Sequence, residues 1–524
     1  MRSLSLTTAL VALALAVGGS AGKSNTGKSS KPPGHGPGKP KIKDVSAACN
    51  TLFTTLPNQV AFPNTTSYAL SSNYWSTRQS ALHPSCFLTP SSPAAVSSAL
   101  KLLTSNSIPF TVKSGGHTAF PGSNINSTGI TIDLRLLNTI TVSPDRRTVS
   151  VGPGNHWINV TTVLDPLGLA VVGGRSADPG IGGLTLGGGI SYFSGQRGWA
   201  CDNVRAYEVV LASGEMVTAS PTSNSDLYWS LRGGAATNLG IVTRFDLASF
   251  EQGLLWANSL VYNATLNSTL IPLFQNLTVT GLPSDPAAHT YFGFVRQPEL
   301  GEYLIYSDQF HATPASSDAT NVPEVFEPFA QVPALVRLPR LSNLTALLQA
   351  IQQPYGERQI WMNVAVKGTS AALLQDILPL HEEHVQRMLN SANGTRVTPY
   401  LTFQPIPVNV LDAMQVNGGN ALGLTRDDGP LVIVQSATAW VSEALDWNVE
   451  SSTRVFIQDV ERLAKRRNLD HGFIYMNYAE DSQDVFDRYG PDNKKRLREV
   501  AKKYDPDGVL QKLWRGYFKL WYQA

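Results

Sequence analysis

The hydrophobic pattern of the first half of the chain alternates between helical and strand-like stretches. From Pro93 to Leu103 apolar side chains recur at helical spacing, and the two serines before Pro93 suit an N-cap. The apolar runs 206–211 and 216–219 flank a Ser-Gly pair, which indicates a hairpin. Further short strands are expected over 110–113, 130–133, 139–142 and 148–151, and a helix over 155–164.

The pattern changes near residue 250. After it, glycine clusters become rarer and aromatic side chains more frequent. Helical stretches over 344–352, 371–391 and 448–468 mix with strand-like runs over 291–296, 303–310, 360–366 and 431–436. This mixture predicts an α+β protein in which residues 251–465 form a second domain, an antiparallel sheet backed by helices. The second domain is inserted between residues 45–250 and 466–524, which form the two parts of the first.

Glycine-rich segments in the first part are the main candidates for a ligand site. The sequence Ser114-Gly115-Gly116-His117-Thr118 follows a strand-like run, and a second cluster extends from Gly180 to Gly189. Adjacent glycines let backbone N–H groups approach a ligand closely. Alone, Gly-Gly-His is more typical of a turn with a bystander histidine. Neither segment is a Rossmann fingerprint or a P-loop, because neither contains the strand–GxGxxG–helix or the GxxxxGK pattern.

Taken in order with two later segments, these glycine segments resemble the FAD domain of the vanillyl-alcohol-oxidase superfamily. The later segments are LYWSLRGG at 227–234 and NLGIVT at 238–243. The C-terminal motifs YMNY at 475–478 and KYDPDG at 503–508 narrow the resemblance to the berberine-bridge-enzyme-like branch. The resemblance covers roughly 45–250 and 466–524 and is loose in between. It implies a two-part FAD-binding domain with an inserted substrate domain, and a FAD-dependent oxidoreductase.

The resemblance also implies how FAD is held. His117 is expected to bond covalently to the flavin 8α-methyl group. Ser176 aligns with a cysteine that forms a second link in many relatives, so a single link is expected here. Pro179 aligns with a position that controls oxygen access, which favours an oxidase over a dehydrogenase. The implied cofactor-binding residues are Ser114, Gly115, Gly116, His117, Thr118, Pro179, Gly180, Gly182, Gly183, Thr185, Gly187, Gly188, Gly240, Ile241, Val242 and Asn477.

The candidates for acid–base chemistry are Tyr475, Tyr478 and Gln435. On a strand, Tyr475 and Asn477 would face one way and Tyr478 the other, unless the strand ends there. The resemblance implies that both tyrosines reach the active site, although each could also be a core aromatic with a satisfied hydroxyl. An unperturbed tyrosine has a pKa of about 10, so a tyrosinate base needs a cation or a helix terminus nearby. Gln435 aligns with a catalytic glutamate of some relatives. An amide does not accept a proton usefully, so Gln435 either orients substrate or is an ordinary polar group of a sheet.

Composition excludes some classes of partner. Charged residues make up 15% and hydrophobic residues 42%, and the net charge is +2. Six lysines lie within 23–43, so the rest is neutral to slightly acidic. Neither nucleic acid nor an anionic membrane is therefore expected as a partner; the expected partners are a small-molecule substrate and O₂ as electron acceptor, and the oligomeric state stays open.

Other notable side chains are expected to be structural. The segment His381-Glu-Glu-His384 lacks the spacing of the HExxH zinc motif, since residue 385 is valine. It is expected to be a solvated helix face, and no metal site is predicted. Trp199, Trp229 and Trp440 are expected in the core.

The N-terminus and the asparagines indicate export. Residues 1–21 combine Arg2, an apolar run and a small-residue end, as a secretory signal does. The run is short for a membrane span, and residues 22–44 form a Lys/Gly/Pro tail that is expected to be flexible. A secreted glycoprotein is therefore expected. Eight N-x-Ser/Thr sequons are present, at Asn64, Asn126, Asn159, Asn263, Asn267, Asn276, Asn343 and Asn393.

The chain has three cysteines. As in the berberine-bridge-like branch, Cys49 is expected to pair with Cys86. Cys201 is left over in an apolar stretch and is expected to be a buried, inert thiol. The odd count leaves any pairing unproven.

Overall fold

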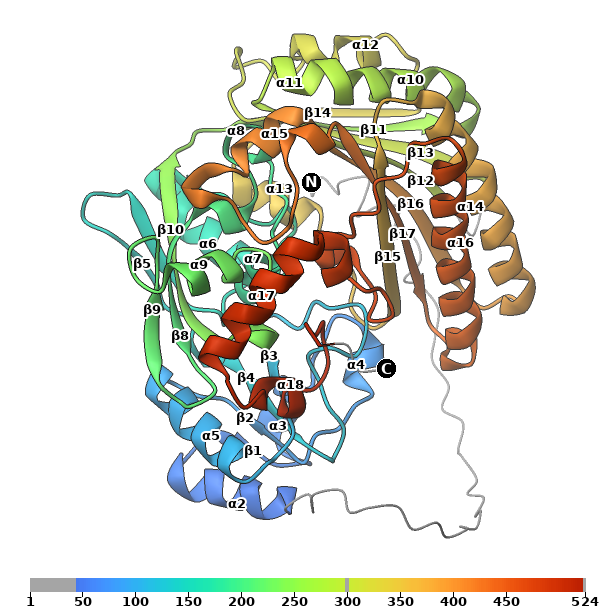
Figure 1. The fold of residues 1–524 in the computed structure, drawn as a ribbon. Helices are drawn as coiled ribbons and strands as arrows, with labels where there is room; N and C mark the ends of the chain where they lie inside the picture. Colours follow the sequence, from blue (N-terminus) through green and yellow to red (C-terminus); the bar gives the residue numbers. More distant parts are fainter. Residues whose placement is uncertain (1–43, 297–300, 522–524) are drawn as a thin grey trace.

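The computed structural model describes residues 44–296 and 301–521 and shows an α+β protein, as predicted (Figure 1). The predicted signal peptide and the Lys/Gly/Pro tail lie outside the described residues, except for Asp44. The Asp44 carboxylate accepts a hydrogen bond of 2.9 Å from the backbone of Ser46 and so caps the first helix, α2. Three β-sheets organise the chain.

The first sheet has four strands in the order β1-β2-β4-β3, of which the last three are parallel. Helix α5 connects β2 to β3; the Ser92 hydroxyl accepts from Ala95 N and Pro93 occupies the first turn, as the sequence predicts. The strands are β1 (Val60–Ala61), β2 (Cys86–Leu88), β3 (Phe110–Lys113) and β4 (Ile130–Asp133). The helices are α2 (Val45–Thr55), α3 (Thr66–Ser71), α4 (Thr77–Ser80) and α5 (Pro93–Ser105).

The second sheet is antiparallel, with the order β5-β6-β10-β8-β9 and β7 paired to β10. The predicted hairpin is confirmed: β8 and β9 pair through a turn in which Gly214 has a positive φ of 79°. The strands are β5 (Ile140–Val142), β6 (Thr148–Val151), β7 (Leu169–Val171), β8 (Val204–Val210), β9 (Met216–Ala219) and β10 (Ile241–Glu251). The helices are α6 (Trp157–Leu164), α7 (Ile181–Leu186), α8 (Ser194–Arg197) and α9 (Ser225–Leu231).

The third sheet has seven antiparallel strands in the order β14-β11-β13-β12-β16-β17-β15. Helices α10, α14 and α16 cover one face and share a hydrophobic core with it (Figure 1), which confirms the predicted sheet backed by helices. Its strands are β11 (Leu255–Asn263), β12 (Ala288–Arg296), β13 (Tyr303–His311), β14 (Val336–Ser342), β15 (Arg358–Lys367), β16 (Val397–Ile406) and β17 (Leu431–Trp440). The helices are α10 (Asn267–Asn276), α11 (Leu282–Ser284), α12 (Glu327–Ala330), α13 (Leu344–Ala350), α14 (Ala371–Ala392), α15 (Val408–Ala413) and α16 (Asp446–Arg466).

Two helices of the inserted stretch pack on the first core rather than behind their own sheet. Leu347 and Leu348 of α13 and Leu411 of α15 belong to the cluster that fills the first two sheets. The C-terminal helices α17 (Pro491–Tyr504) and α18 (Val509–Leu513) join the same cluster, and Arg515 N donates to Phe110 O of β3 at 2.7 Å. The chain end therefore returns to the first domain and fixes it to the start of the fold.

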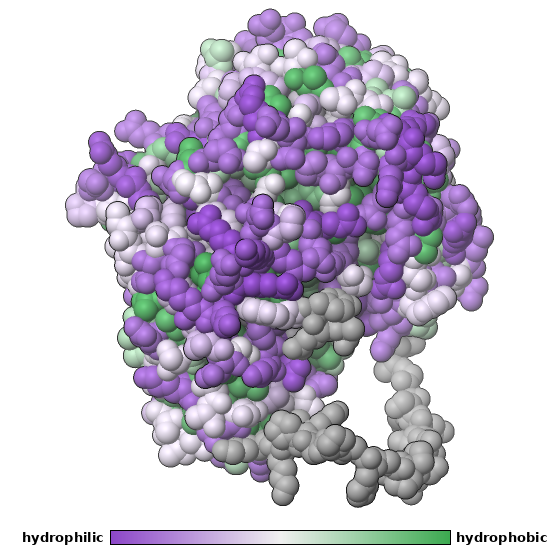
Figure 2. Space-filling view, viewed as in Figure 1, coloured by the Kyte–Doolittle hydropathy of each residue, from purple (hydrophilic) through white to green (hydrophobic). Residues whose placement is uncertain are grey.

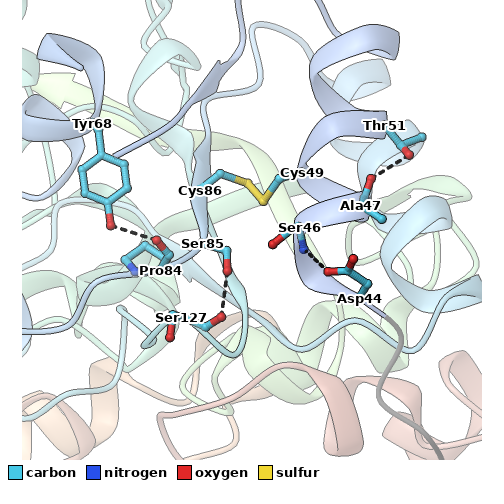
Figure 3. The surroundings of a disulfide bond; sticks show 10 residues. All are labelled: Asp44, Ser46, Ala47, Cys49, Thr51, Tyr68, Pro84, Ser85, Cys86 and Ser127. Atoms are coloured by element: carbon cyan, nitrogen blue, oxygen red, sulfur yellow. Dashed lines mark hydrogen bonds between the residues drawn. A yellow bond between two sulfur atoms is a disulfide. The ribbon is translucent and has the colours of Figure 1, made fainter. Parts of the chain in front are cut away.

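A disulfide joins Cys49 of α2 to Cys86 of β2, as the resemblance implied (Figure 3). Cys201 is a free thiol with no exposed surface, so its expected burial is confirmed. Trp199, Trp229 and Trp440 are also buried, as predicted.

The prediction for His381 and His384 was wrong. Both side chains are almost fully buried on the inner face of α14, where His384 Nε2 lies 2.8 Å from Asp459 of α16 and His381 packs against Phe456. The helix turns both histidines, three residues apart, toward its neighbour. No group of residues able to hold a metal occurs in the part of the chain that the structure describes.

The surface carries the predicted glycosylation sites. Seven of the eight sequon asparagines are exposed and Asn267 is half-buried. The face drawn in Figure 2 is mostly hydrophilic. Within 44–296 and 301–521, no helix combines the length and apolar character needed to cross a membrane.

Candidate active site

A cavity of about 590 Å³ lies between the glycine-rich loops of the first domain and the uncovered face of the seven-stranded sheet. We call its two sides the loop wall (residues 114–118, 175–187 and 475–479) and the sheet wall (the cavity-facing side chains of β11–β13 and β15–β17). Alternation along each strand builds the sheet wall: in β17, Gln435 and Ala437 line the cavity, while Val432 and Val434 enter the core behind the sheet. The size suits a small-molecule site.

In the loop wall, two glycine segments touch backbone to backbone. A Cβ added to Gly115 would lie 2.4 Å from the Gly180 nitrogen, and one added to Gly180 would lie 2.3 Å from the Gly115 nitrogen. Both positions therefore require glycine. Gly183 also lines the cavity, and a Cβ added to it would have no atom within 4 Å, so open space lies in front of it.

His117 is presented to the cavity from this wall. Its ring stacks on Trp75, with centroids 4.1 Å apart and planes within 6°. Burial lowers the pKa of His117 to about 3, so the imidazole is neutral at physiological pH. Its Nε2 is buried without a hydrogen-bond partner among the described residues. A buried, unpartnered nitrogen in a cavity wall indicates that a ligand completes the site.

The cavity therefore fits a flavin cofactor on three observations: the unpartnered His117 nitrogen, the open space at Gly183 and the paired glycine loops. The cofactor residues expected from the sequence divide into two groups. Those that line the cavity are Ser114, Gly115, Gly116, His117, Thr118, Pro179, Gly180, Gly182, Gly183, Gly187, Ile241, Val242 and Asn477.

Three expected cofactor residues do not line the cavity. Thr185 is fully buried, with its hydroxyl unpartnered among the described residues. Gly188 (φ +118°) packs against the rings of Trp199 and Tyr475, and Gly240 (φ +154°) packs against β8. The left-handed φ of Gly188 and the lack of space for a side chain at both positions explain why each residue is a glycine.

Ser176, which the resemblance aligns with the cysteine of a second flavin link in many relatives, lines the cavity. Its hydroxyl donates to the carbonyl of Ile351 at 2.9 Å, which holds the loop wall to the chain after α13. The fully buried Cys201 does not line the cavity and so does not replace the missing cysteine.

Tyr475 and Tyr478 both reach the cavity because the backbone is not a strand there. Residues Met476–Tyr478 form a 3₁₀ turn capped by Tyr475. Residues three apart eclipse each other in this conformation, so both rings lie on one side, with centroids 4.8 Å apart. The two tyrosines therefore face the same way, and not opposite ways as on a strand.

Tyr475 sits in a set of hydrogen-bond donors. Its oxygen accepts from the backbone N–H groups of Gly189 (3.1 Å) and Ile190 (3.2 Å) and from Asn477 Nδ2 (3.0 Å). The Asn363 side chain bonds both backbone groups of Tyr475, at 2.9 and 3.0 Å. Burial and the neighbouring Tyr478 raise the pKa of Tyr475, and the three donors oppose this rise.

Tyr478 contacts a cation that the sequence did not reveal. Arg175 Nη2 donates to the Tyr478 hydroxyl at 2.6 Å, and Nη1 donates to Gln404 Oε1 at 2.6 Å and His289 Nε2 at 2.9 Å. Arg175 lies next to Ser176 in a glycine-flanked loop, which was its only signal in the sequence. Its partners are 114 to 303 residues away along the chain.

Gln435 lies on β17 between Asn363 of β15 and Thr402 of β16. It is 6% exposed and lines the cavity on the sheet wall. Its side chain therefore faces the site, opposite the two tyrosines of the loop wall, rather than the helices behind the sheet.

Comparisons with known proteins agree with this arrangement. Residues 84–220 match a family described as FAD binding domain. FAD-dependent monooxygenase tpcD of Cochliobolus heterostrophus is 35% identical over 90% of this chain and 94% of its own length. BBE-like 1 of Physcomitrella patens has a TM-score of 0.70 at 19% identity, covering 91% of this chain and 100% of that one. A chitooligosaccharide oxidase has a TM-score of 0.70 at 18% identity, covering 90% and 100%.

The relatives show that the protein is a FAD-dependent oxidoreductase, and the solved structures show the shared fold. The motifs around His117, Gly180 and Tyr475 converge on one cavity, as the resemblance implied for its site. The chain belongs to the vanillyl-alcohol-oxidase (PCMH-type) superfamily of FAD-linked oxidoreductases, and it shares the fold of BBE-like 1.

Proposed function

We propose that the protein is a secreted oxidase that converts a hydroxyl-bearing carbon of a carbohydrate or an aromatic metabolite to a carbonyl and reduces O₂ to H₂O₂. The observation that carries the proposal is the Tyr475 hydroxyl, which lines the cavity with three N–H donors directed at its oxygen. Bound FAD supplies the two-electron acceptor, taking a hydride from the substrate carbon and passing the electrons to O₂.

In this proposal Tyr475 acts as its phenolate and takes the hydroxyl proton of the substrate. Three N–H groups stabilise negative charge on its oxygen, in the manner of an oxyanion hole. Asn363 fixes the backbone from which the ring projects, so the oxygen keeps its position. Tyr478 and Gln435 hold the substrate from the two walls, since both face the cavity.

His117 holds the cofactor through a single covalent bond. Its neutral, unpartnered ring nitrogen would hold the flavin at the 8α carbon, in place of one hydrogen there. The serine at position 176 supports a single link, because a hydroxyl engaged with Ile351 O forms no thioether. The proline at position 179, which lines the cavity, supports the use of O₂ by analogy with the family.

Export rests on the N-terminal leader and on the sequons. The exposed sequon asparagines are open to modification in the secretory route.

Monooxygenation is the second candidate, and the name of the relative from Cochliobolus heterostrophus favours it. A monooxygenase places one oxygen atom of O₂ in the product and releases the other as water. The two candidate reactions therefore differ in whether oxygen from labelled O₂ appears in the organic product.

The test follows the 450 nm flavin absorbance of the purified protein. Acid precipitation should leave flavin on the pellet, and complete release would rule out the His117 bond. Anaerobic addition of oligosaccharides, aryl alcohols or hydroxy acids should bleach the band, and air should restore it with release of H₂O₂. Under ¹⁸O₂, an oxidase gives labelled H₂O₂ and unlabelled product. Labelled product would establish the monooxygenase, slow recovery in air with fast recovery on quinone would establish a dehydrogenase, and a band that no substrate bleaches would indicate a silent relative.

A further inference from the structure

Arg175 is a cavity-lining cation without an acid partner among the described residues. Two arginines line the cavity, and Arg396 forms an ion pair with Glu357. Within the described residues, Arg175 has no carboxylate at ion-pair distance. Its contacts are instead the neutral groups of Gln404, Tyr478 and His289.

The neutrality of His289 is fixed by its surroundings. Burial and the adjacent Arg175 charge lower the pKa of His289 well below its usual range, so the imidazole accepts from the guanidinium without carrying charge. Gln404 also accepts a hydrogen bond from Arg175 without carrying charge. Its Nε2 donates to the carbonyls of Thr290 and Pro405, and this orientation turns Oε1 toward Arg175. The guanidinium is therefore held in place and its charge is left uncompensated.

The acids of the cavity are engaged elsewhere. Besides Glu357, the cavity-lining acid is Asp308 on β13, which accepts from the Ser259 hydroxyl at 2.5 Å. Burial raises the pKa of Asp308, and Arg340 of β14 opposes this rise. Asp308 therefore has partners of its own, and no ion pair joins it to Arg175 among the described residues.

Arg175 also has donors to spare. A guanidinium carries five N–H groups, and the described contacts use three of them. The N–H on Nε and one N–H on Nη2 remain. Because the Tyr478 oxygen already accepts from Arg175, the Tyr478 hydroxyl can donate its own hydrogen. The two free N–H groups of Arg175 and the Tyr478 hydroxyl together give three donors, enough to bind both oxygens of a carboxylate.

Resting on the proposed oxidation, we propose that Arg175 and the Tyr478 hydroxyl bind a carboxylate group of the substrate, which is a hydroxylated carboxylic acid of aromatic type. The neighbouring aromatic side chains favour a flat ring: Tyr291, over whose face Arg175 lies at 5.3 Å, and Trp361, which meets the Tyr478 ring edge to face at 5.5 Å. The ring centroids of Tyr475 and Tyr478 lie 4.8 Å apart. A substrate whose hydroxyl meets Tyr475 and whose carboxylate meets Tyr478 is therefore a compact molecule.

The experiment compares benzoate with benzamide, which has nearly the same shape but no charge. Binding to the flavin-loaded protein is measured by calorimetry at one pH and one ionic strength, so no turnover is needed and a catalytically silent protein still gives an answer. The wild type should bind benzoate about tenfold to a hundredfold more tightly, as a charge-assisted hydrogen bond implies. Equal affinities would overturn the proposal, and the proposed oxidation would stand or fall separately on flavin bleaching.

Variants separate ligand binding from support of the fold. Arg175→Gln should abolish the preference by weakening benzoate alone, whereas equal weakening of both probes would show a purely structural cross-link. Arg175→Lys, which keeps the charge, should retain part of the preference, and Tyr478→Phe should weaken benzoate about tenfold through one lost donor. If the Arg175→Gln protein does not hold flavin, the affinities of Arg175→Lys and Tyr478→Phe for the two probes test the proposal instead. The matched control is Arg205→Gln on the exposed side of β8, which should leave both affinities unchanged.

Discussion

The two walls of the cavity are built by opposite means. The loop wall relies on backbone: Gly115 and Gly180 touch without side chains between them, and the oxygen of Tyr475 is held largely by main-chain N–H groups. The sheet wall relies on side chains that alternate along paired strands, such as Tyr306 and Thr402, whose hydroxyls lie 2.6 Å apart. A substitution at Gly115 or Gly180 therefore disturbs the main chain, whereas one in the sheet wall changes the shape and polarity of the cavity.

The comparison is tested most strongly at two tyrosines, one in each wall. Tyr475→Phe removes the proposed base and should lower kcat about 10²- to 10⁴-fold. Tyr306→Phe is the matched control, since it removes a hydroxyl from the sheet wall and should change kcat less than about tenfold. Both rates are measured by anaerobic flavin bleaching in stopped flow, after flavin content has been equalised.

Two outcomes would break this assignment. Equal losses in the two variants would mean that Tyr475 has no special role. A loss in Tyr475→Phe caused by the three donors left without their acceptor would appear as reduced unfolding stability and flavin content, and not in the bleaching rate of the remaining holoenzyme.

A contrast between local and long-range features also explains how much of the fold could be predicted from the sequence. Helix α5, strands β3 and β4 and the hairpin β8–β9 follow from local patterns, and the structure has them at or near the expected residues. Strand β16 was missed because it contains Pro399 and Pro405, which argue against a strand.

The site was predictable where it depends on local sequence and not where it depends on register. His117 and its glycines form one continuous motif, so they could be found. The contact between Arg175 and Tyr478 spans 303 residues, and that between Asn363 and Tyr475 spans 112. Each pair joins segments that lie far apart in the sequence and meet only in the folded chain, so no pattern within either segment predicts the contact.

The second prediction tests the backbone contact of the loop wall. Gly180→Ala places a methyl group 2.3 Å from the Gly115 nitrogen, and neither main chain can move without displacing the His117 loop. We expect a loss of about 3 kcal/mol in the free energy of unfolding and little bound flavin. Gly183→Ala is the control, because nothing lies within 4 Å of its added methyl group and stability should hold. Urea unfolding of the flavin-free proteins distinguishes them, and similar stabilities would show that the loops adapt.

The smallest expected effect is on the pH dependence of stability. It concerns two buried histidines, His117 in the loop wall and His381 behind the sheet. Burial lowers the pKa of each to about 3, against about 6.5 in the unfolded chain. Between these values the unfolded chain binds more protons than the folded protein. Stability is therefore intact above pH 6.5 and falls as the pH drops, by about 1.4 kcal/mol per pH unit for each free imidazole.

His381→Gln isolates the contribution of the sheet region. His381 is wedged between Tyr303 and Phe456, with no ligand to bind, so it titrates in this way whether or not flavin is present. The variant should lose about 1.4 kcal/mol less than the wild type for each pH unit between 6.5 and 5, measured by urea unfolding. His83→Gln, at an exposed position, should keep the wild-type slope. An unchanged slope in His381→Gln would show that α14 and α16 part enough to hydrate the imidazole, and that the region behind the sheet is less rigid than the loop wall.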